Sequence, residues 1–360
     1  MSLRSHASWA ALAAGLCLSF GLSVSLPTPV EAAARSRQTT VRKSTAKKTS
    51  TVSRAKSRTT TRSKASAARR ARLARARAAA RAAAIREAQI PRYKTDATGA
   101  MVPDLHAAAA IIYNPETKQV LWEEHSQDKR SIASITKVMT AVVFSETDPD
   151  PAQVVTIERR DVYAASTTHL RANYVVSVDD LMHLLLISSD NAAARALARV
   201  SPWGPDGFVR RMNEKAVELG LQSTTYADPS GLDAANVSSA YDMARLITYA
   251  AGDEWIAEIM RKKEHQLVLG RRARTIHSTN RLLANSELQP NVIGGKTGFI
   301  GRAGYCLVTL LKLPEVNQPV AVVVLGARSN AGRFTEARNL FGWVSGKAKD
   351  LLSGKNEPPE

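Results

Sequence analysis

The sequence predicts an α/β fold in which one sheet is flanked by helices and carries a helical insert. Three observations support this prediction. Strand-like runs occur towards both ends of the globular part, helical patterns fill the segments between them, and 44% of the 360 residues are hydrophobic. Strands at both ends of the segment can share one sheet, against which the intervening helices pack. The length is sufficient for one large domain or two small ones.

The expected elements follow in chain order. Residues 107–113 and 118–122, separated by Asn114-Pro115, are typical of a β-hairpin. Helical patterns then cover residues 134–144, 178–200 with a break at 188–191, 206–219 and 240–251. Later strand-like runs cover residues 266–269, 304–311 and 320–325, and a last amphipathic helix covers residues 333–352.

Residues 1–32 are typical of a signal peptide. Arg4 supplies a positive start, residues 7–24 are mostly apolar, and Val30-Glu31-Ala32 offers a place where a signal peptidase can cut. The alternative is a membrane anchor, because an apolar run of about 18 residues approaches spanning length, although Ser and Gly dilute it. We expect an exported, periplasmic protein that is soluble or peripherally held.

Residues 33–92 form a basic low-complexity tail. Arg35 to Arg92 holds 19 basic residues and one acid, whereas Tyr93 to Glu360 holds 30 of each, so the net charge of +18 belongs to the tail. This distribution excludes a basic nucleic-acid-binding domain. Residues 35–64 should be disordered and residues 65–89 should form a frayed helix. The tail is expected either to bind an anionic membrane or cell-wall surface or to act as a solvated spacer.

Cysteine and histidine usage predicts neither a disulfide framework nor a metal site. Cys17 lies inside the predicted signal peptide, and Cys306 lies in an apolar stretch. The seven histidines form no H-E-x-x-H or H-x-x-x-H pair. We therefore expect no metal and no other cofactor.

The first of three chemical motifs is Ser134-Ile-Thr-Lys137, at the start of an expected helix. Residues at i and i+3 share a helix face, so the hydroxyl and the ammonium can be close. A lysine whose pKa is lowered by burial can act as the base for a serine nucleophile. The alternative is a serine that only caps a helix.

The other two motifs contain residues that can act together with Ser134 and Lys137. In Ser189-Asp190-Asn191, at a break between helices, a second hydroxyl can relay a proton and an amide can hold Lys137, although all three residue types also cap helices. Lys296-Thr297-Gly298 follows two glycines at the start of an expected edge strand, where the Lys and Thr can bind an anion. A structural turn is the alternative for this motif.

In this order, the three motifs resemble the set of penicillin-binding proteins and class A β-lactamases. Residues from Leu105 to about Gly346 resemble the low-molecular-mass penicillin-binding proteins, the D-alanyl-D-alanine carboxypeptidase and endopeptidase family. The similar segments are residues 133–141, 228–232, 236–240, 296–299 and 303–305. The resemblance implies the transpeptidase fold of that family, with an antiparallel sheet flanked by helices and a helical subdomain, over residues 93–352. Residues 353–360 form a polar end.

The resemblance also implies roles for the motif residues. Ser134 is expected to attack the substrate carbonyl, with Lys137 as its base. Ser189 is expected to pass a proton to the leaving amine, and Asn191 to position Lys137 and the substrate amide. The oxyanion is expected to lie on the backbone N–H groups of Ser134 and Phe299.

The carboxylate of a substrate or a β-lactam is expected to meet Lys296 and Thr297, with Gly298 permitting close approach. Arg333, in a segment similar to one of the family, is expected to orient that carboxylate. The alternative for Arg333 is an ion pair with Glu336 at a helix start.

Only 62 residues follow Gly298, which leaves no room for the second, β-rich domain of the carboxypeptidases. The chain therefore resembles the shorter endopeptidase branch, which cuts D-Ala–diaminopimelate cross-links of peptidoglycan and is inhibited by β-lactams. The alternatives are a D-alanyl-D-alanine carboxypeptidase, a β-lactamase whose deacylating carboxylate is Glu218, and an inactive wall-binding module.

Overall fold

The computed structural model describes residues 66–80 and 90–352. The predicted signal peptide, most of the basic tail and the polar end at 353–360 lie outside these residues. Residues 66–80 form an exposed helix, in agreement with the first part of the expected tail helix, and residues 81–89 are again outside. Among the described helices, none has both the length and the apolar character needed to cross a bilayer.

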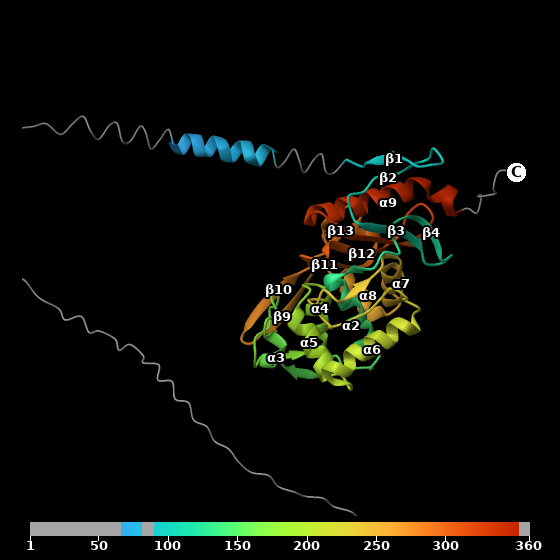
Figure 1. Cartoon of the computed structure of the whole chain (residues 1–360). Helices are drawn as coiled ribbons and strands as arrows, with labels where there is room; N and C mark the ends of the chain where they lie inside the picture. Colours follow the sequence, from blue (N-terminus) through green and yellow to red (C-terminus); the bar gives the residue numbers. More distant parts are fainter. Residues whose placement is uncertain (1–65, 81–89, 353–360) are drawn as a thin grey trace, which may run out of the picture. The chain divides into compact units, whose positions relative to one another are not determined.

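A five-stranded antiparallel sheet forms the centre of the domain (Figure 1). Its strand order is β11-β12-β13-β3-β4, so strands from both ends of the domain lie side by side. The strands are β3 (Ala109–Asn114), β4 (Gln119–Glu124), β11 (Val292–Ile300), β12 (Gly304–Leu313) and β13 (Gln318–Ala327). The expected sheet made of N-terminal and C-terminal strands is confirmed.

Both faces of the sheet are covered by helices. On one face packs the long C-terminal helix α9 (Asn330–Leu352), and on the other packs α7 (Ala240–Ala250) (Figure 1). Successive residues of β3 therefore enter different cores: Ile111 packs with the helical region, and Ile112 packs with the α9 side. This two-sided burial explains why the strand reads as a continuous apolar run.

The helical region lies between β4 and β9 in the sequence. Its helices are α2 (Thr136–Ser145), α3 (Arg159–Val162), α4 (Val178–Leu186), α5 (Asn191–Val200), α6 (Gly204–Glu218), α7 and α8 (Glu254–Arg261). Helix α2 is buried along nearly its whole length, because α4, α5, α6 and α7 all pack around it. The helix that follows the first motif is thus the centre of this region.

Short strands complete the domain. They are β1 (Tyr93–Thr95), β2 (Met101–Pro103), β5 (Arg130–Ser131), β6 (Val154–Thr156), β7 (Val175–Ser177), β8 (Val237–Ser238), β9 (Glu264–Leu269) and β10 (Arg272–His277). Strands β9 and β10 form an antiparallel hairpin. The sequence predicted only β9 of these. It did not predict α3 or α8 either.

Candidate active site

The Lys137 amine and the Ser134 hydroxyl are hydrogen-bond partners. Ser134 lies in a 3-10 turn, η1 (Ala133–Ile135), directly before α2, and the Lys137 Nζ is 3.0 Å from its Oγ. The same Nζ donates to Asn191 Oδ1 at 2.6 Å and to the carbonyl oxygen of Ser230 at 2.5 Å. A neutral amine has two N–H donors and one lone pair. With both donors occupied in this way, its lone pair faces Ser134 and can accept the hydroxyl proton.

Burial favours the neutral form of the Lys137 amine. Its side chain is fully inaccessible, and desolvation lowers its pKa to about 7, against the opposing influence of the Asp190 and Asp228 carboxylates. At neutral pH a large fraction of Lys137 is therefore uncharged. The helix-cap alternative for Ser134 does not apply, because Ser134 lies within η1 rather than at a helix N-cap.

The second motif separates α4 from α5, as predicted. Asp190 caps α5 by accepting hydrogen bonds from the N–H groups of Ala192 and Ala193 at 2.9 and 3.0 Å. The helix-cap interpretation is thus correct for Asp190, while its neighbours Ser189 and Asn191 line the cleft. Ser189 has a φ of +62°, a left-handed conformation that is uncommon for residues other than glycine.

The third motif joins the second through Lys296. The Lys296 Nζ donates to Ser189 Oγ at 2.7 Å and to the carbonyl oxygen of Thr297 at 2.9 Å. Burial, reinforced by the charges of Lys137 and Arg333, holds the pKa of Lys296 well below its usual value. The motif occupies the middle and later part of β11, not its start, so the structural-turn alternative is wrong; the expected edge position is confirmed.

Gly298 allows β11 to lie directly against η1. A Cβ at this position would be 2.7 Å from the carbonyl oxygen of Ile132, a contact that no larger residue tolerates. The third-motif strand is therefore adjacent to the turn that carries Ser134. The next residue, Phe299, is 50% exposed and stacks on Tyr305 with ring centroids 4.2 Å apart.

Arg333 reaches the site from the first turns of α9. Its Nη1 donates to the carbonyl oxygens of Gly298 and Cys306 at 2.9 and 3.1 Å, and burial lowers its pKa to about 10, which leaves it charged at neutral pH. The alternative ion pair with Glu336 is wrong, because no such pair forms and the Glu336 carboxylate accepts the backbone N–H of His106 instead. The guanidinium lines the cleft beside β11.

A cleft of about 220 Å³ connects these groups. It brings together Ser134, Ser189, Asn191, Thr297, Gly298, Phe299 and Arg333, with Lys137 and Lys296 buried beneath its surface. Sequence reasoning missed the other lining residues, which are Ser166, Thr167, Ser188, Leu232 and Thr279. Of these, only Leu232 and Ser188, which lies in the predicted helix break, belong to segments that carried a signal. The hydroxyl of Thr297 donates to that of Thr279 at 2.7 Å, a contact that no local pattern predicts.

Glu218, the carboxylate expected of a β-lactamase, lies away from the cleft. It is the last residue of α6 and pairs with Arg211 and with Lys215. These two cations lower its pKa to about 2. Glu218 is absent from the cleft lining, so it cannot activate a water at Ser134.

A family comparison agrees with this geometry. Residues 96–329 match the peptidase family S11, described as D-alanyl-D-alanine carboxypeptidase. The chain belongs to this family. The matched segment contains Ser134, Lys137, Ser189 and Lys296, and ends shortly before Arg333.

Relatives and solved structures of this S11 peptidase support the same assignment. The D-alanyl-D-alanine endopeptidase of Escherichia coli is 32% identical over 69% of this chain and 80% of its own length. A D-alanyl-D-alanine carboxypeptidase of Bacillus subtilis is also 32% identical, over 65% of this chain and 61% of its own. The Streptomyces K15 DD-transpeptidase has a TM-score of 0.62 at 26% identity, covering 67% of this chain and 97% of its own. The predicted family and fold are confirmed.

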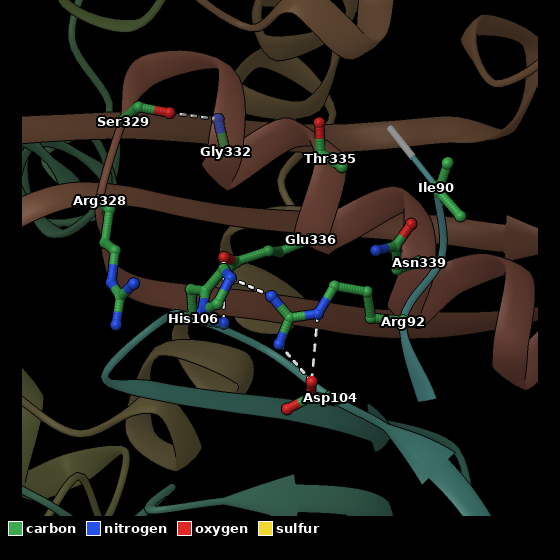
Figure 2. A pocket seen from close by; sticks show the side chains of 10 residues that line it. All are labelled: Ile90, Arg92, Asp104, His106, Arg328, Ser329, Gly332, Thr335, Glu336 and Asn339. Atoms are coloured by element: carbon green, nitrogen blue, oxygen red, sulfur yellow. Dashed lines mark hydrogen bonds and ion pairs between the residues drawn. The ribbon is translucent and has the colours of Figure 1, made fainter. Parts of the chain in front are cut away.

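A second cavity, of about 320 Å³, lies beside α9 (Figure 2). Arg92 pairs with Asp104 there, and Glu336 of α9 faces the segment that contains His106. Burial raises the pKa of Glu336 to about 6. These contacts attach the segment before β3 to α9, on the side of the sheet opposite to α7.

Proposed function

We propose that this S11 peptidase is a serine D-alanyl-D-alanine endopeptidase that cleaves D-Ala–diaminopimelate cross-links of peptidoglycan. The observation that carries this proposal is the position of the Lys137 Nζ, in contact with Ser134, Asn191 and Ser230. This arrangement supports a serine nucleophile activated by a buried lysine.

In the first half-reaction the Ser134 oxygen attacks the D-Ala carbonyl carbon while its proton passes to Lys137. The negative charge on the carbonyl oxygen rests on the N–H groups of Ser134 and Phe299, which belong to adjacent segments because of Gly298. The C–N bond then breaks, and the leaving amine takes a proton from Ser189. The proton that Lys137 received from Ser134 replaces it on Ser189, which leaves Lys137 neutral for the second half-reaction. Lys296, which donates to Ser189 at 2.7 Å, supports the orientation of that hydroxyl.

In the second half-reaction a water replaces the leaving amine. Lys137, again neutral, takes a proton from the water, and the hydroxide attacks the ester carbon of the acyl-Ser134. The ester bond breaks and Ser134 recovers its proton. Penicillins would stop the enzyme at the acyl stage, with their carboxylate beside Thr297, Lys296 and Arg333, where the local charge is positive.

The endopeptidase activity is favoured over carboxypeptidase activity by the extent of the similarities. The match to the Escherichia coli endopeptidase spans 80% of that protein, whereas the match to the Bacillus subtilis carboxypeptidase spans 61% of it. The similar region thus covers a larger share of the endopeptidase sequence than of the carboxypeptidase sequence. The chemistry at Ser134 is common to both activities.

We also propose that residues 1–32 direct export to the periplasm, that residues 33–92 hold the enzyme near an anionic membrane or wall surface, and that residues 93–352 form the peptidase domain. The charge of the tail supports this division, because it holds the whole net charge of the chain.

Digestion of purified peptidoglycan distinguishes the two activities. The enzyme should convert cross-linked dimeric muropeptides to monomers, identified by mass, faster than it removes terminal D-Ala from monomeric pentapeptides. A Ser134→Ala variant should do neither. Free D-Ala as the main product would instead identify a carboxypeptidase.

A further inference from the structure

Helix α4 and strand β9 bring together two imidazoles and a carboxylate outside the active site. Asp179 and His183 lie at i and i+4 on α4, and His265 lies on β9. One ligand atom of each lies within 4.8 Å of the other two, and the two imidazole rings stack with centroids 3.8 Å apart. The sequence predicted no metal site because its histidines form no closely spaced pair, and His183 and His265 lie far apart in the sequence.

We propose that Asp179, His183 and His265 bind a divalent transition-metal ion of the zinc class. Two nitrogen donors and one carboxylate oxygen form the set that zinc accepts in sites with a fourth, open position. Nitrogen donors disfavour magnesium and calcium, which prefer oxygen ligands alone. Asp179 has a side chain 38% exposed, which gives the ion and a completing water access from solvent.

The spacing of the first two ligands already fits. The Asp179 Oδ2 and the His183 Nδ1 are 3.2 Å apart, close to the roughly 3.3 Å that separates two ligands of a tetrahedral zinc ion with bonds of about 2 Å. To complete the set, the ring of His265, which is stacked on that of His183 at an interplanar angle of 20°, has to turn so that its free nitrogen points to the ion. His265 is only partly buried, so this movement needs no rearrangement of the core.

Neighbouring groups orient two of the three ligands. The indole N–H of Trp255 donates to Asp179 Oδ1 at 3.0 Å, which leaves Oδ2 for the ion. Asp180 Oδ1 lies 2.8 Å from His265 Nε2, so a carboxylate holds that ring and leaves Nδ1 as the donor. Carboxylate–histidine–metal arrangements of this kind are common in zinc sites.

Two existing contacts of His183 have to be given up. Its Nδ1 lies 2.9 Å from the backbone carbonyl oxygen of Asp179, a hydrogen bond that the ion replaces. The Lys262 Nζ is 3.0 Å from His183 Nε2, the nitrogen that the ion does not use. The same ammonium also contacts Glu258 Oε1 at 3.0 Å, so a partner remains when the His183 contact is lost. Lys262 thus weakens the site without blocking it.

Such an ion would join the two segments that deliver residues to the cleft. The chain leaves α4 and reaches Ser189 three residues later, and it leaves the β9–β10 hairpin to reach Thr279, which contacts Thr297. Metal binding at this place is therefore expected to stabilise the fold around the active site rather than to take part in the reaction.

Zinc titration of the untagged full chain tests the proposal, with a chromogenic chelator as competitor and thermal unfolding as the second readout. The wild type should bind zinc and unfold at a higher temperature in its presence. Binding to His265→Ala and Asp179→Asn should be at least about tenfold weaker, and Asp180→Asn should weaken it by about 10 to 100-fold through the loss of ring orientation.

The matched control is His277→Ala. His277 is an exposed histidine of the same hairpin, paired with Glu264, and its loss should leave zinc affinity unchanged. Circular dichroism without zinc verifies that each variant is folded, and the absorption bands of bound cobalt distinguish nitrogen and oxygen ligands from the thiolate of a cysteine. Equal zinc affinity of the wild type and His265→Ala, or no binding at all, would overturn the proposal, and either result leaves the proposed peptidase function untouched.

Discussion

At the residue scale, the chemistry depends on a lysine that is both buried and uncharged. The 0% exposure of Lys137 leaves its ammonium without water, so proximity to Asp190 and Asp228 only partly compensates the desolvation. The contact with Ser134 was predictable, because residues at i and i+3 always meet on a helical turn. The contact of Lys296 with Ser189 spans 107 residues, and nothing in the sequence predicted it.

Replacing Ser134 by alanine should abolish covalent labelling by a fluorescent penicillin and leave the fold intact. Ser126 provides the matched control, because it also precedes a lysine by three residues and is buried, but it donates to Glu123 and lies outside the cleft. Ser126→Ala should therefore be labelled like the wild type. Gel fluorescence after labelling measures both. Labelling that persists in Ser134→Ala would assign the nucleophile to another residue.

Lys137→Arg should reduce the acylation rate by about 10²-fold or more, because arginine keeps the charge but cannot release its proton at neutral pH. Stopped-flow acylation by a chromogenic β-lactam measures this rate. A near-normal rate in the variant would mean that only the positive charge of Lys137 is needed.

The pH dependence of the wild type follows from the same group. With a pKa of about 7, Lys137 becomes neutral as the pH rises through about 7, so the acylation rate should rise with pH and fall towards acid. The rate measured across this interval should show a midpoint near 7. A flat profile would contradict a role for Lys137 as base.

At the element scale, the sequence predicted most of the long helices and strands and missed most of the short ones. The apolar runs of β3, β12 and β13 and the period of α4 to α7 predicted their type, because burial dictates the residues along them. Strands β6 and β7 have only three residues each, and the arginines of β10 conceal its alternation. Gly294 and Gly295 suggested that β11 starts after them, yet the strand begins at Val292. Gly295 is a glycine within the strand because a Cβ there would lie 2.8 Å from Asn280 Nδ2 and 3.0 Å from the carbonyl oxygen of Val308.

The attachment of α9 offers a test at this scale. Burial raises the pKa of Glu336 from 4.5 to about 6, so the folded state favours its protonated form. This carboxyl contributes most to stability below about pH 4.5, and the contribution is lost as the pH rises through about 6. Glu336→Gln should therefore stabilise the protein at pH 8 by up to about 2 kcal/mol and have little effect near pH 4.

Urea unfolding at the two pH values measures this difference. The exposed Glu315 provides the control, since Glu315→Gln should change stability equally and only slightly at both. A destabilised Glu336→Gln at pH 8 would mean that the charged carboxylate is needed by the backbone N–H of His106.

At the scale of the whole molecule, the excess positive charge and the proposed catalytic residues lie in different parts of the chain. Residues 93–360 carry equal numbers of acidic and basic side chains, and the excess of 18 positive charges lies before them. Composition alone predicted this separation, because it needs no knowledge of the fold. Composition cannot specify the surface that the tail binds, since any polyanion satisfies the same charges.

Deletion of residues 35–89 should therefore leave turnover of small soluble muropeptides unchanged, because every residue of the cleft lies in the peptidase domain. The same deletion should weaken adsorption to peptidoglycan sacculi or to anionic vesicles, measured by co-sedimentation. The loss should shrink with added salt, because exposed charges more than roughly 8 Å apart are largely screened near physiological ionic strength. A full-length variant with the tail arginines and lysines replaced by glutamine is the control for length. If that variant adsorbs like the wild type, or if adsorption does not depend on salt, the tail serves as a spacer.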